Sequence, residues 1–429
     1  MFRTLANAWK IPDLRKKILY TALLLVVFRF GSIIPVPGLD KQVLADLVAN
    51  GANSLFGFFN TISGGAFGNA TIFAMSITPY INSSIIMQLL TVSIHALERL
   101  SKEGEEGRKK IAQYTRYGTI LLAFIQAAGL YAALQGSITG YGNGFLAFIA
   151  VTFSFTAGTA FLMWLGEKIT EKGVGNGISL IIFIGIISRA KDLVNAGISY
   201  MQGNHYSLLS IALVVAFVVV AVICIAYVIV INEGERRLPV QYAKRMQGRK
   251  MYGGQSTYIP LKVAMAGVMP IIFAMSILSF PATIANLFGA NPAAGTFWYG
   301  FLKLFNSDSW FYAILYFLLI IFFTYFYTSI QYNPVEIANN MKRNGGFLLG
   351  IRPGKPTSDY IQKILTRVTL IGAFALGLIA VLPVLLAVVT GSNIGIGGTS
   401  ILIVVSVALE TVKQIESQML MRQYKGFLE

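Results

Sequence analysis

The chain has 429 residues, of which 55% are hydrophobic and only 12% are charged, and its formal net charge is +16. This composition provides too little polar surface for an ordinary soluble protein, so we expect a membrane protein. The positive charge then follows from membrane topology and attracts anionic lipid, rather than indicating nucleic acid. The one cysteine, Cys224, excludes an internal disulfide and a cysteine-based metal cluster.

Apolar runs long enough to span a bilayer recur along the whole chain. A membrane helix needs about 20 mostly apolar residues. Runs of this kind lie near residues 18–36, 71–94, 117–135, 145–165, 177–200, 208–231, 263–288, 310–332, 368–390 and 396–416. The run at 72–93 contains polar residues, and the run at 175–189 contains glycine and polar residues. Such spans usually face a cavity or other helices, which favours a transport path through the protein.

The basic residues are distributed unevenly between the connections of these spans. Of the 34 Lys and Arg residues, 29 fall on one side of the membrane and only Lys41, Arg189, Lys191 and Lys303 on the other. Cationic loops stay cytoplasmic during insertion, so we expect both termini in the cytoplasm. Arg29 is left inside the first span, where it pairs with helix carbonyls, snorkels outward or contacts a partner subunit.

The segment 51–70 is too polar and too rich in glycine to cross the bilayer, and it leads directly into the second span. It is either an exposed loop on the outer side or a re-entrant segment. The side chains of Leu55, Phe56, Phe58 and Phe59 are too apolar to lie comfortably in water, which favours the re-entrant segment.

Two long connections on the cytoplasmic side, residues 232–262 and 333–367, combine basic residues with Gly and Pro. They are either solvated loops that only fix orientation or structured surfaces that dock a cytoplasmic partner. Their length favours docking.

The sequence offers no set of residues for catalysis or metal binding. The two histidines, His95 and His205, lie near span ends on opposite sides of the membrane. The run Gly350–Lys355 has three residues between its glycines, not the four of a phosphate loop, and Pro356 stands where Ser or Thr is needed. We therefore expect no enzymatic activity and no cofactor, so any energy from ATP comes from a partner.

No Asp or Glu lies near the middle of any expected span, whereas coupled transporters keep carboxylates there to handle protons or sodium. This argues against the main alternative, a small-molecule secondary transporter built from inverted repeats. A third class, a membrane-embedded enzyme, lacks paired acid, base or metal ligands. A passive conduit fits the sequence best.

Eight motifs occur in the order and with the spacing of a known family. They are IPVPG at Ile34–Gly38, SITPYINSSIIMQLL at Ser76–Leu90, EGEEGRKKIAQYTRYGT at Glu103–Thr119, GTAFLMWLGEKIT at Gly158–Thr170, GVGNGISLIIF at Gly173–Phe183, QSTYIPLKV at Gln255–Val263, GIRPGK at Gly350–Lys355 and GGTSILIVV at Gly397–Val405. Over essentially its full length the chain resembles the SecY family, the central subunits of the bacterial protein-conducting channel. The ending ETVKQIESQMLMRQYKGF looks most like the members from Bacillus-type Firmicutes.

The resemblance implies an all-α polytopic membrane protein with ten transmembrane helices. Two inverted, pseudo-symmetric halves of five helices, residues 1–200 and 201–429, would clamp an hourglass pore. The waist of the pore would be a ring of apolar side chains: Ile81, Ile85, Ile182, Ile186, Ile272 and Ile403. Within each of the pairs Ile81/Ile85 and Ile182/Ile186 the residues are four apart, so each pair shares a helix face.

The resemblance also implies that residues 55–70 form a plug, a short helix in the outer funnel below the ring. Its residues would be Leu55, Phe56, Phe58, Phe59, Ile62, Gly64, Gly65 and Phe67, with hinge freedom at the glycines. Spans two and three would meet spans seven and eight at a lateral gate, through which apolar segments reach lipid.

As partners the resemblance implies the SecE and SecG subunits, the SecA motor ATPase, a translating ribosome, signal peptides, unfolded polypeptides and anionic lipid. The protein would pass secretory chains across the bacterial cytoplasmic membrane and release membrane segments sideways into lipid. The motor or the ribosome would dock on the two long connections, through Arg236, Arg237, Lys244, Arg245, Arg249, Lys250, Arg352 and Lys355.

Overall fold

The computed structural model describes residues 2–50, 60, 62–134, 144–203, 208–242, 245–247, 250–252, 256–287, 300, 304–305, 309–390 and 398–425. The helices are α1 (Phe2–Lys10), α2 (Pro12–Gly31), α3 (Lys41–Asn50), α5 (Thr78–Ser93), α6 (His95–Lys102), α7 (Glu105–Ala133), α8 (Phe145–Lys172), α9 (Gly177–Ser188), α10 (Ala190–Gly203), α11 (Leu208–Glu233), α12 (Met269–Leu287), α14 (Trp310–Gln331), α15 (Pro334–Arg343), α16 (Lys355–Thr390) and α17 (Gly398–Lys425). The strands are β1 (Glu235–Tyr242), β2 (Arg245–Gln247), β3 (Lys250–Tyr252), β4 (Ser256–Lys262) and β5 (Gly346–Leu348).

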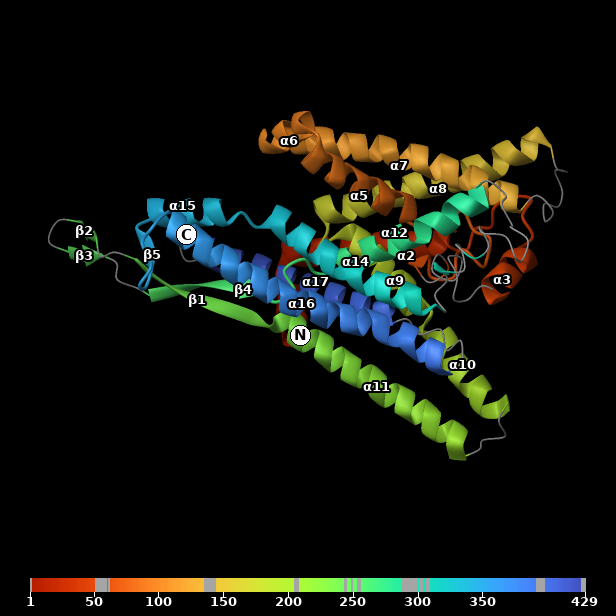
Figure 1. Cartoon of the computed structure of the whole chain (residues 1–429). Coiled ribbons are helices and arrows are strands. Elements are labelled where there is room, and N and C mark those ends of the chain that lie inside the picture. The colour runs from red at the N-terminus through yellow and green to blue at the C-terminus, as the bar shows by residue number, and fades with distance from the viewer. Residues whose placement is uncertain are drawn as a thin grey trace.

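The long helices pack side by side into an elongated bundle (Figure 1). The strands and α15 lie at one end of the bundle, and α3 and α10 lie at the other. Neighbours include α14 with α16, α5 with α7, α7 with α8, and α11 with α17. A large cluster of buried aliphatic and aromatic side chains lies between α2, α5, α9, α12 and α17, so the core of the molecule coincides with the place expected for the ring.

The helices have the lengths and apolar composition of a polytopic membrane protein. Among the described residues, four stretches are long and apolar enough to cross a bilayer: Phe145–Lys172, Val214–Glu233, Trp310–Arg343 and Lys355–Leu382. The pair α5 and α6, bent by 100°, makes a fifth if it is one broken span. Each of the ten expected spans overlaps at least one of the helices.

Two of the expected spans begin with turns rather than helix. Residues 63–77 form a series of turns before α5, and residues 263–268 do so before α12. The backbone is left-handed at Ser76, with φ of 53°, and at Gly267, with φ of 59°. A right-handed helix cannot include such residues, so both helices begin later than the apolar runs indicate. The fifth expected span is divided at Arg189, between α9 and α10.

The two long basic connections form one unit instead of two separate projections. β1 pairs antiparallel with β4 along one edge and with β5 along the other, where Val240 lies opposite Leu348. This sheet has a hydrophobic core of its own, separate from that of the bundle, which includes Leu238, Val240, Leu261, Met341, Leu348 and Ile361. β2 and β3, which lie between β1 and β4 along the chain, form a small second sheet.

Candidate functional site

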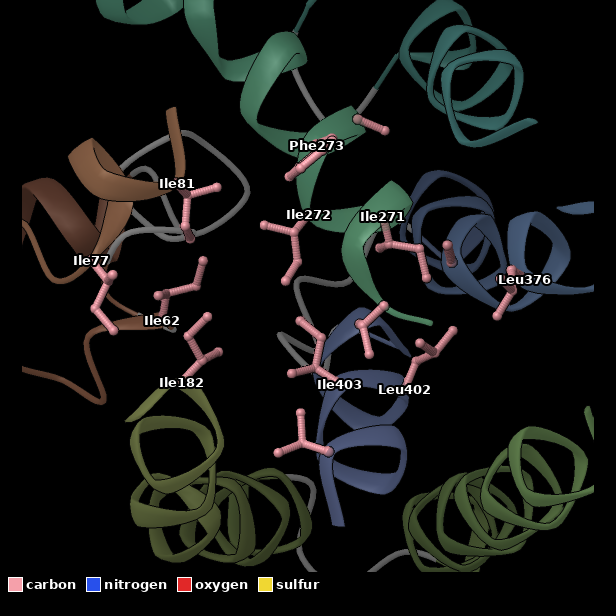
Figure 2. Packing of buried hydrophobic residues seen from close by; sticks show 14 of the residues in the cluster. Ile62, Ile77, Ile81, Ile182, Ile271, Ile272, Phe273, Leu376, Leu402 and Ile403 are labelled. Carbon is pink, nitrogen blue, oxygen red and sulfur yellow. The ribbon is translucent and has the colours of Figure 1, made fainter. Parts of the chain in front are cut away.

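The ring isoleucines come from four helices and meet in the middle of the molecule. Ile81 and Ile85 lie on α5, Ile182 and Ile186 on α9, Ile272 on α12 and Ile403 on α17. Five of them belong to one hydrophobic cluster, and Ile186 packs against it as a partly buried neighbour. Figure 2 shows Ile81, Ile182, Ile272 and Ile403 facing one another around a common centre.

The ring side chains are aliphatic and, except for that of Ile186, nearly inaccessible to solvent. Ile81 is 6% exposed, Ile272 is 7% exposed and Ile403 is 3% exposed. Branched aliphatic groups offer no hydrogen bond to water or to an ion, so a contact of this kind opposes the passage of both. The same groups make only dispersion contacts with each other, and such contacts separate without breaking a specific bond.

Local features of the sequence place the ring residues on their helices. The Oδ1 of Asn176 caps α9 by accepting hydrogen bonds from two backbone N–H groups of its first turn, at 3.1 and 3.3 Å, and Ile182 lies in the following turn. Pro79 lies in the first turn of α5, where its missing N–H costs nothing. Further along α5, Ser83 Oγ donates to the Thr115 carbonyl at 2.8 Å, which fixes α5 against α7.

The described part of the expected plug, residues 60 and 62–70, lies directly against the ring. Ile62 belongs to the same cluster as the ring and faces its centre in Figure 2. Phe67 is buried in a second cluster with residues that include Val36 and Phe155. From residue 63 this segment consists of turns and not of the expected short helix, because Gly64 and Gly65 have left-handed φ values of 67° and 87°. Leu55, Phe56, Phe58 and Phe59 lie outside the described residues.

Short polar contacts give this segment a defined shape. Asn60 Oδ1 accepts a hydrogen bond from the Gly68 N–H at 3.0 Å, and Ser63 Oγ accepts one from the Phe67 N–H at 3.1 Å. Thr71 Oγ1 donates to the Ala66 carbonyl at 3.0 Å. These bonds replace the ones that a helix would supply, so the segment is ordered by its own side chains.

The IPVPG motif fixes the far end of the segment. The Val36 N–H donates to the Ala70 carbonyl at 2.8 Å, and the Ile72 N–H donates to the Ile34 carbonyl at 3.1 Å. The motif therefore holds the chain where the turns lead towards α5.

Arg29 lies in the last turn of α2, closer to a helix end than the apolar run indicates. Its Nη1 donates to Ser188 Oγ at 3.0 Å and to the Gly64 carbonyl at 3.4 Å. The structure shows pairing with a carbonyl, but this carbonyl belongs to the turns under the ring and not, as was expected for Arg29, to a helix.

The basic residues of the two long connections differ in their surroundings. Arg236, Arg352 and Lys355 are exposed. Arg237 is also exposed, but its Nε lies 2.6 Å from Glu235 Oε1 and its guanidinium lies 4.8 Å from the centre of the Tyr258 ring. The hydrogen bond to Glu235 raises the pKa of the Arg237 guanidinium. For Arg245 and Lys250 the structure gives the backbone, in β2 and β3, while Lys244 and Arg249 lie outside the described residues.

The helices of the expected lateral gate are in contact. α12 packs against α5 and α7 on one side and against α14 on the other. In the part of the chain that the structure describes, no group of three or more His, Cys, Asp or Glu side chains could hold a metal ion.

The comparisons with known proteins agree with this geometry. The SecY family model matches residues 71–412. The protein translocase subunit SecY of Halalkalibacterium halodurans is 48% identical and that of Streptomyces galbus 46%, and each match covers 100% of both chains.

Three solved structures share the fold. One described as the structure of a protein conducting channel has a TM-score of 0.69 at 19% identity, and the match covers 94% of this chain and 92% of that one. A second, concerning a plug domain that stabilises the closed state of the SecY translocation channel, has a TM-score of 0.67 at 18% identity with the same coverage. The Sec61 of a canine ribosome-channel complex has a TM-score of 0.64 at 17% identity, again with the same coverage.

The fold and the ring define an all-α, multi-pass membrane protein with the architecture of protein-conducting channels. The full-length identity to translocase subunits then identifies the family: the chain belongs to the SecY family.

Sequence reasoning missed three parts of this site. Ile77, Ile271 and Leu402 surround the ring within the same cluster, but single aliphatic residues in apolar runs give no signal of their own. The polar contacts of Asn60 were also missed, although Asn, Ser and Gly together are typical of turns. The strands of the basic connections could have been found, because the burial of Leu238 and Val240 reflects the alternation in ERRLPVQY.

Gly64 and Gly65 offer a matched test of how the segment docks. Both have left-handed φ, 67° and 87°, so alanine strains the backbone at either position. A Cβ at Gly64 would lie 2.8 Å from the Gly185 Cα, whereas at Gly65 its nearest neighbour would be Asn69 Nδ2 at 4.0 Å.

We therefore expect Gly64→Ala, but not Gly65→Ala, to displace the segment. The measurement is maleimide labelling of a cysteine at Ala66, which is 1% exposed, in a Cys224→Ser background. Because overpacking costs about 1–3 kcal/mol, Gly64→Ala should raise the labelling rate roughly tenfold above that of Gly65→Ala. Equal rates for the two variants would contradict the close contact.

Proposed function

We propose that the ring of isoleucines is the constriction of a channel that passes unfolded polypeptides across the membrane and releases apolar segments into lipid. The observation that supports it best is the meeting of Ile81, Ile182, Ile272 and Ile403, from four helices, in one cluster at the middle of the bundle. A constriction without hydrogen-bonding groups recognises no particular side chain. It therefore suits a conduit for many sequences.

In this proposal the molecule opens between two halves, residues 1–200 and 201–429. The irregular starts of α5 and α12, one in each half, fit an inverted repeat whose broken helices meet at the transport site. Polar contacts that support the division join elements within a half: Ser83 to Thr115 in the first, and Asn232 Nδ2 to Ser406 Oγ at 3.1 Å in the second.

The lateral gate would open where α12 leaves α5 and α7, and residues 55–70 would be the plug below the ring. A signal peptide would leave through the gate because transferring each buried CH₂ to lipid is worth about 0.8 kcal/mol. The position of Ile62 against the ring supports the plug.

The proposal places the protein in the bacterial cytoplasmic membrane with both termini in the cytoplasm, because basic loops stay on that side. The sheet unit would dock the SecA motor ATPase or a translating ribosome, and SecE and SecG would complete the channel. The chain itself would act as a passive pore without enzymatic activity. The solved structure of a related Sec61 in a ribosome-channel complex supports the ribosome as one partner.

Cross-linking a stalled secretory chain tests the path directly. Cysteines replace Ile81 and Ile272, on opposite sides of the proposed gate, in a Cys224→Ser background. Adducts at both positions are expected, because the polypeptide would pass through the ring. A cysteine at Val222, which is 58% exposed on α11, is the control and should give none. Adducts at neither ring position would demand another path.

A polar residue in the ring should let water and ions enter it. We expect Ile403→Asn to raise ion leak through reconstituted channels at rest and to relax the requirement for an intact signal sequence, because an amide holds water where isoleucine excludes it. Val404→Asn places the same side chain on α17 at a position outside the cluster and should leave the leak unchanged. Wild-type conductance in planar bilayers with Ile403→Asn would refute the seal.

Charge reversal at Arg352 tests the docking surface. Arg352→Glu should depress SecA-driven translocation into inverted membrane vesicles by about tenfold, because like charges would then face an acidic partner. Membrane levels of the channel should not change. Lys41→Glu makes the same type of change at an exposed residue on the face assigned to the other side, and should have no effect. Full activity of Arg352→Glu would remove Arg352 from the interface.

A further inference from the structure

Arg29 is a cation that the ring itself does not use, and its partners connect three parts of the first half. It lies half-buried in the last turn of α2, where a cation also interacts favourably with the helix dipole. Its Nη1 reaches Ser188 Oγ, on α9, at 3.0 Å and the Gly64 carbonyl, in the plug segment, at 3.4 Å.

The directions of these hydrogen bonds indicate that Arg29 is the donor to the Gly64 carbonyl. A serine hydroxyl has one hydrogen, and Ser188 Oγ donates it over the shorter distance, 2.7 Å to the Gly185 carbonyl rather than 3.4 Å to that of Gly64. The Nη1 of Arg29 has two hydrogens, so it serves Ser188 Oγ and the Gly64 carbonyl together. Of the two donors that the structure describes near the Gly64 carbonyl, Arg29 is therefore the one with a hydrogen available for it.

Contact between two backbones lets the segment come close enough for this bond. A Cβ at Gly64 would lie 2.8 Å from the Gly185 carbonyl oxygen, and a Cβ at Gly185 would lie 2.6 Å from the Ile62 carbonyl oxygen. Neither position has room for a side chain, and Gly64 also has the left-handed φ that favours glycine. The plug segment thus lies directly on the backbone of α9.

We infer that Arg29 is a positioning residue that latches the plug segment to α9 and so sets how readily the channel opens. This inference rests on the proposed function of residues 55–70 as a plug. A charge-assisted hydrogen bond is roughly twice as strong as a neutral one, yet it is a single contact and can be exchanged for water once a polypeptide displaces Ile62. The hydrogen bond would hold the plug segment in one position in the closed state, and it would still break when the channel opens.

The experiment compares Arg29→Gln, Arg29→Lys, Ser188→Ala and Ser32→Ala in the full chain reconstituted with its partner subunits. Two quantities are measured at rest: chloride efflux from liposomes and maleimide labelling of a cysteine at Ala66 in the Cys224→Ser background. A cysteine at Ala373, which is 0% exposed on α16 and far along the chain from the segment, reports general loosening. Ser32 Oγ donates to the backbone carbonyl of Arg29, at 2.7 Å, and not to its guanidinium, so Ser32→Ala leaves the guanidinium in place.

With Arg29→Gln we expect both efflux and Ala66 labelling to rise on the order of tenfold, as loss of a bond to a charged donor predicts. Arg29→Lys should fall between Arg29→Gln and wild type, because an ammonium still donates to carbonyls. Ser188→Ala should cause a smaller rise in the same direction. Efflux and labelling with Ser32→Ala, and labelling at Ala373 in every variant, should stay at wild-type levels.

Each contrary result has one meaning. If Gly64→Ala raises efflux but Arg29→Gln and Ser188→Ala do not, the latch is wrong and the plug stands. If Gly64→Ala leaves efflux unchanged as well, the plug fails and the latch with it. If Arg29→Gln exposes Ala373 as much as Ala66, the arginine is a general structural residue and the latch is again overturned.

Discussion

Backbone groups that leave helical geometry inside a membrane protein must find other hydrogen-bond partners, and the structure around the ring depends on this constraint. The turns at 63–77 meet it with local partners. Asn60 Oδ1 accepts a hydrogen bond from the N–H of Gly68, and the N–H of Val36 donates to the carbonyl of Ala70. Because most of these bonds lie within the segment or at its far end, they can persist when the segment moves. A plug that moves as a unit exposes few unpaired groups.

The ring is held by non-directional contacts instead. In the proposed function the ring side chains must separate at a low free-energy cost. The ring side chains that face one another across the proposed seam between α5, α9, α12 and α17 are aliphatic, as Figure 2 shows for Ile182 and Ile403. Directional polar contacts are found within each proposed half. The N–H of Val174 donates to Thr21 Oγ1 at 3.0 Å, which holds the start of α9 to α2 in one half. In the proposed mechanism, directional bonds would keep each half rigid, while dispersion contacts would allow the halves to separate.

The sequence predicted the helices and their order well, because runs of about 20 apolar residues are a strong signal in a bilayer. It also placed the ring isoleucines in one cluster, but through the family motifs, since no local pattern distinguishes Ile272 from its neighbours. It failed where the backbone departs from regular geometry. The turns before α5 depend on left-handed Ser76, and the pairing of β1 with β5 joins residues about a hundred positions apart. Partners of Arg29 were beyond prediction because Gly64 and Ser188 become its neighbours only in three dimensions.

The sequence does not distinguish the basic residues of the two long connections from one another. The structure shows that their charges differ in how available they are to a partner. Arg237 is held between a carboxylate and an aromatic ring, so its charge is largely used within the sheet unit. Arg352 lies in a tight loop between Gly350 and Gly354, whose left-handed φ values of 77° and 108° turn the chain away from the sheet. Its carbonyl accepts from Thr357 Oγ1 at 2.8 Å, which orders the loop while its side chain stays exposed. A docking partner would have to compete with Glu235 and Tyr258 for the guanidinium of Arg237, so it would gain more from Arg352.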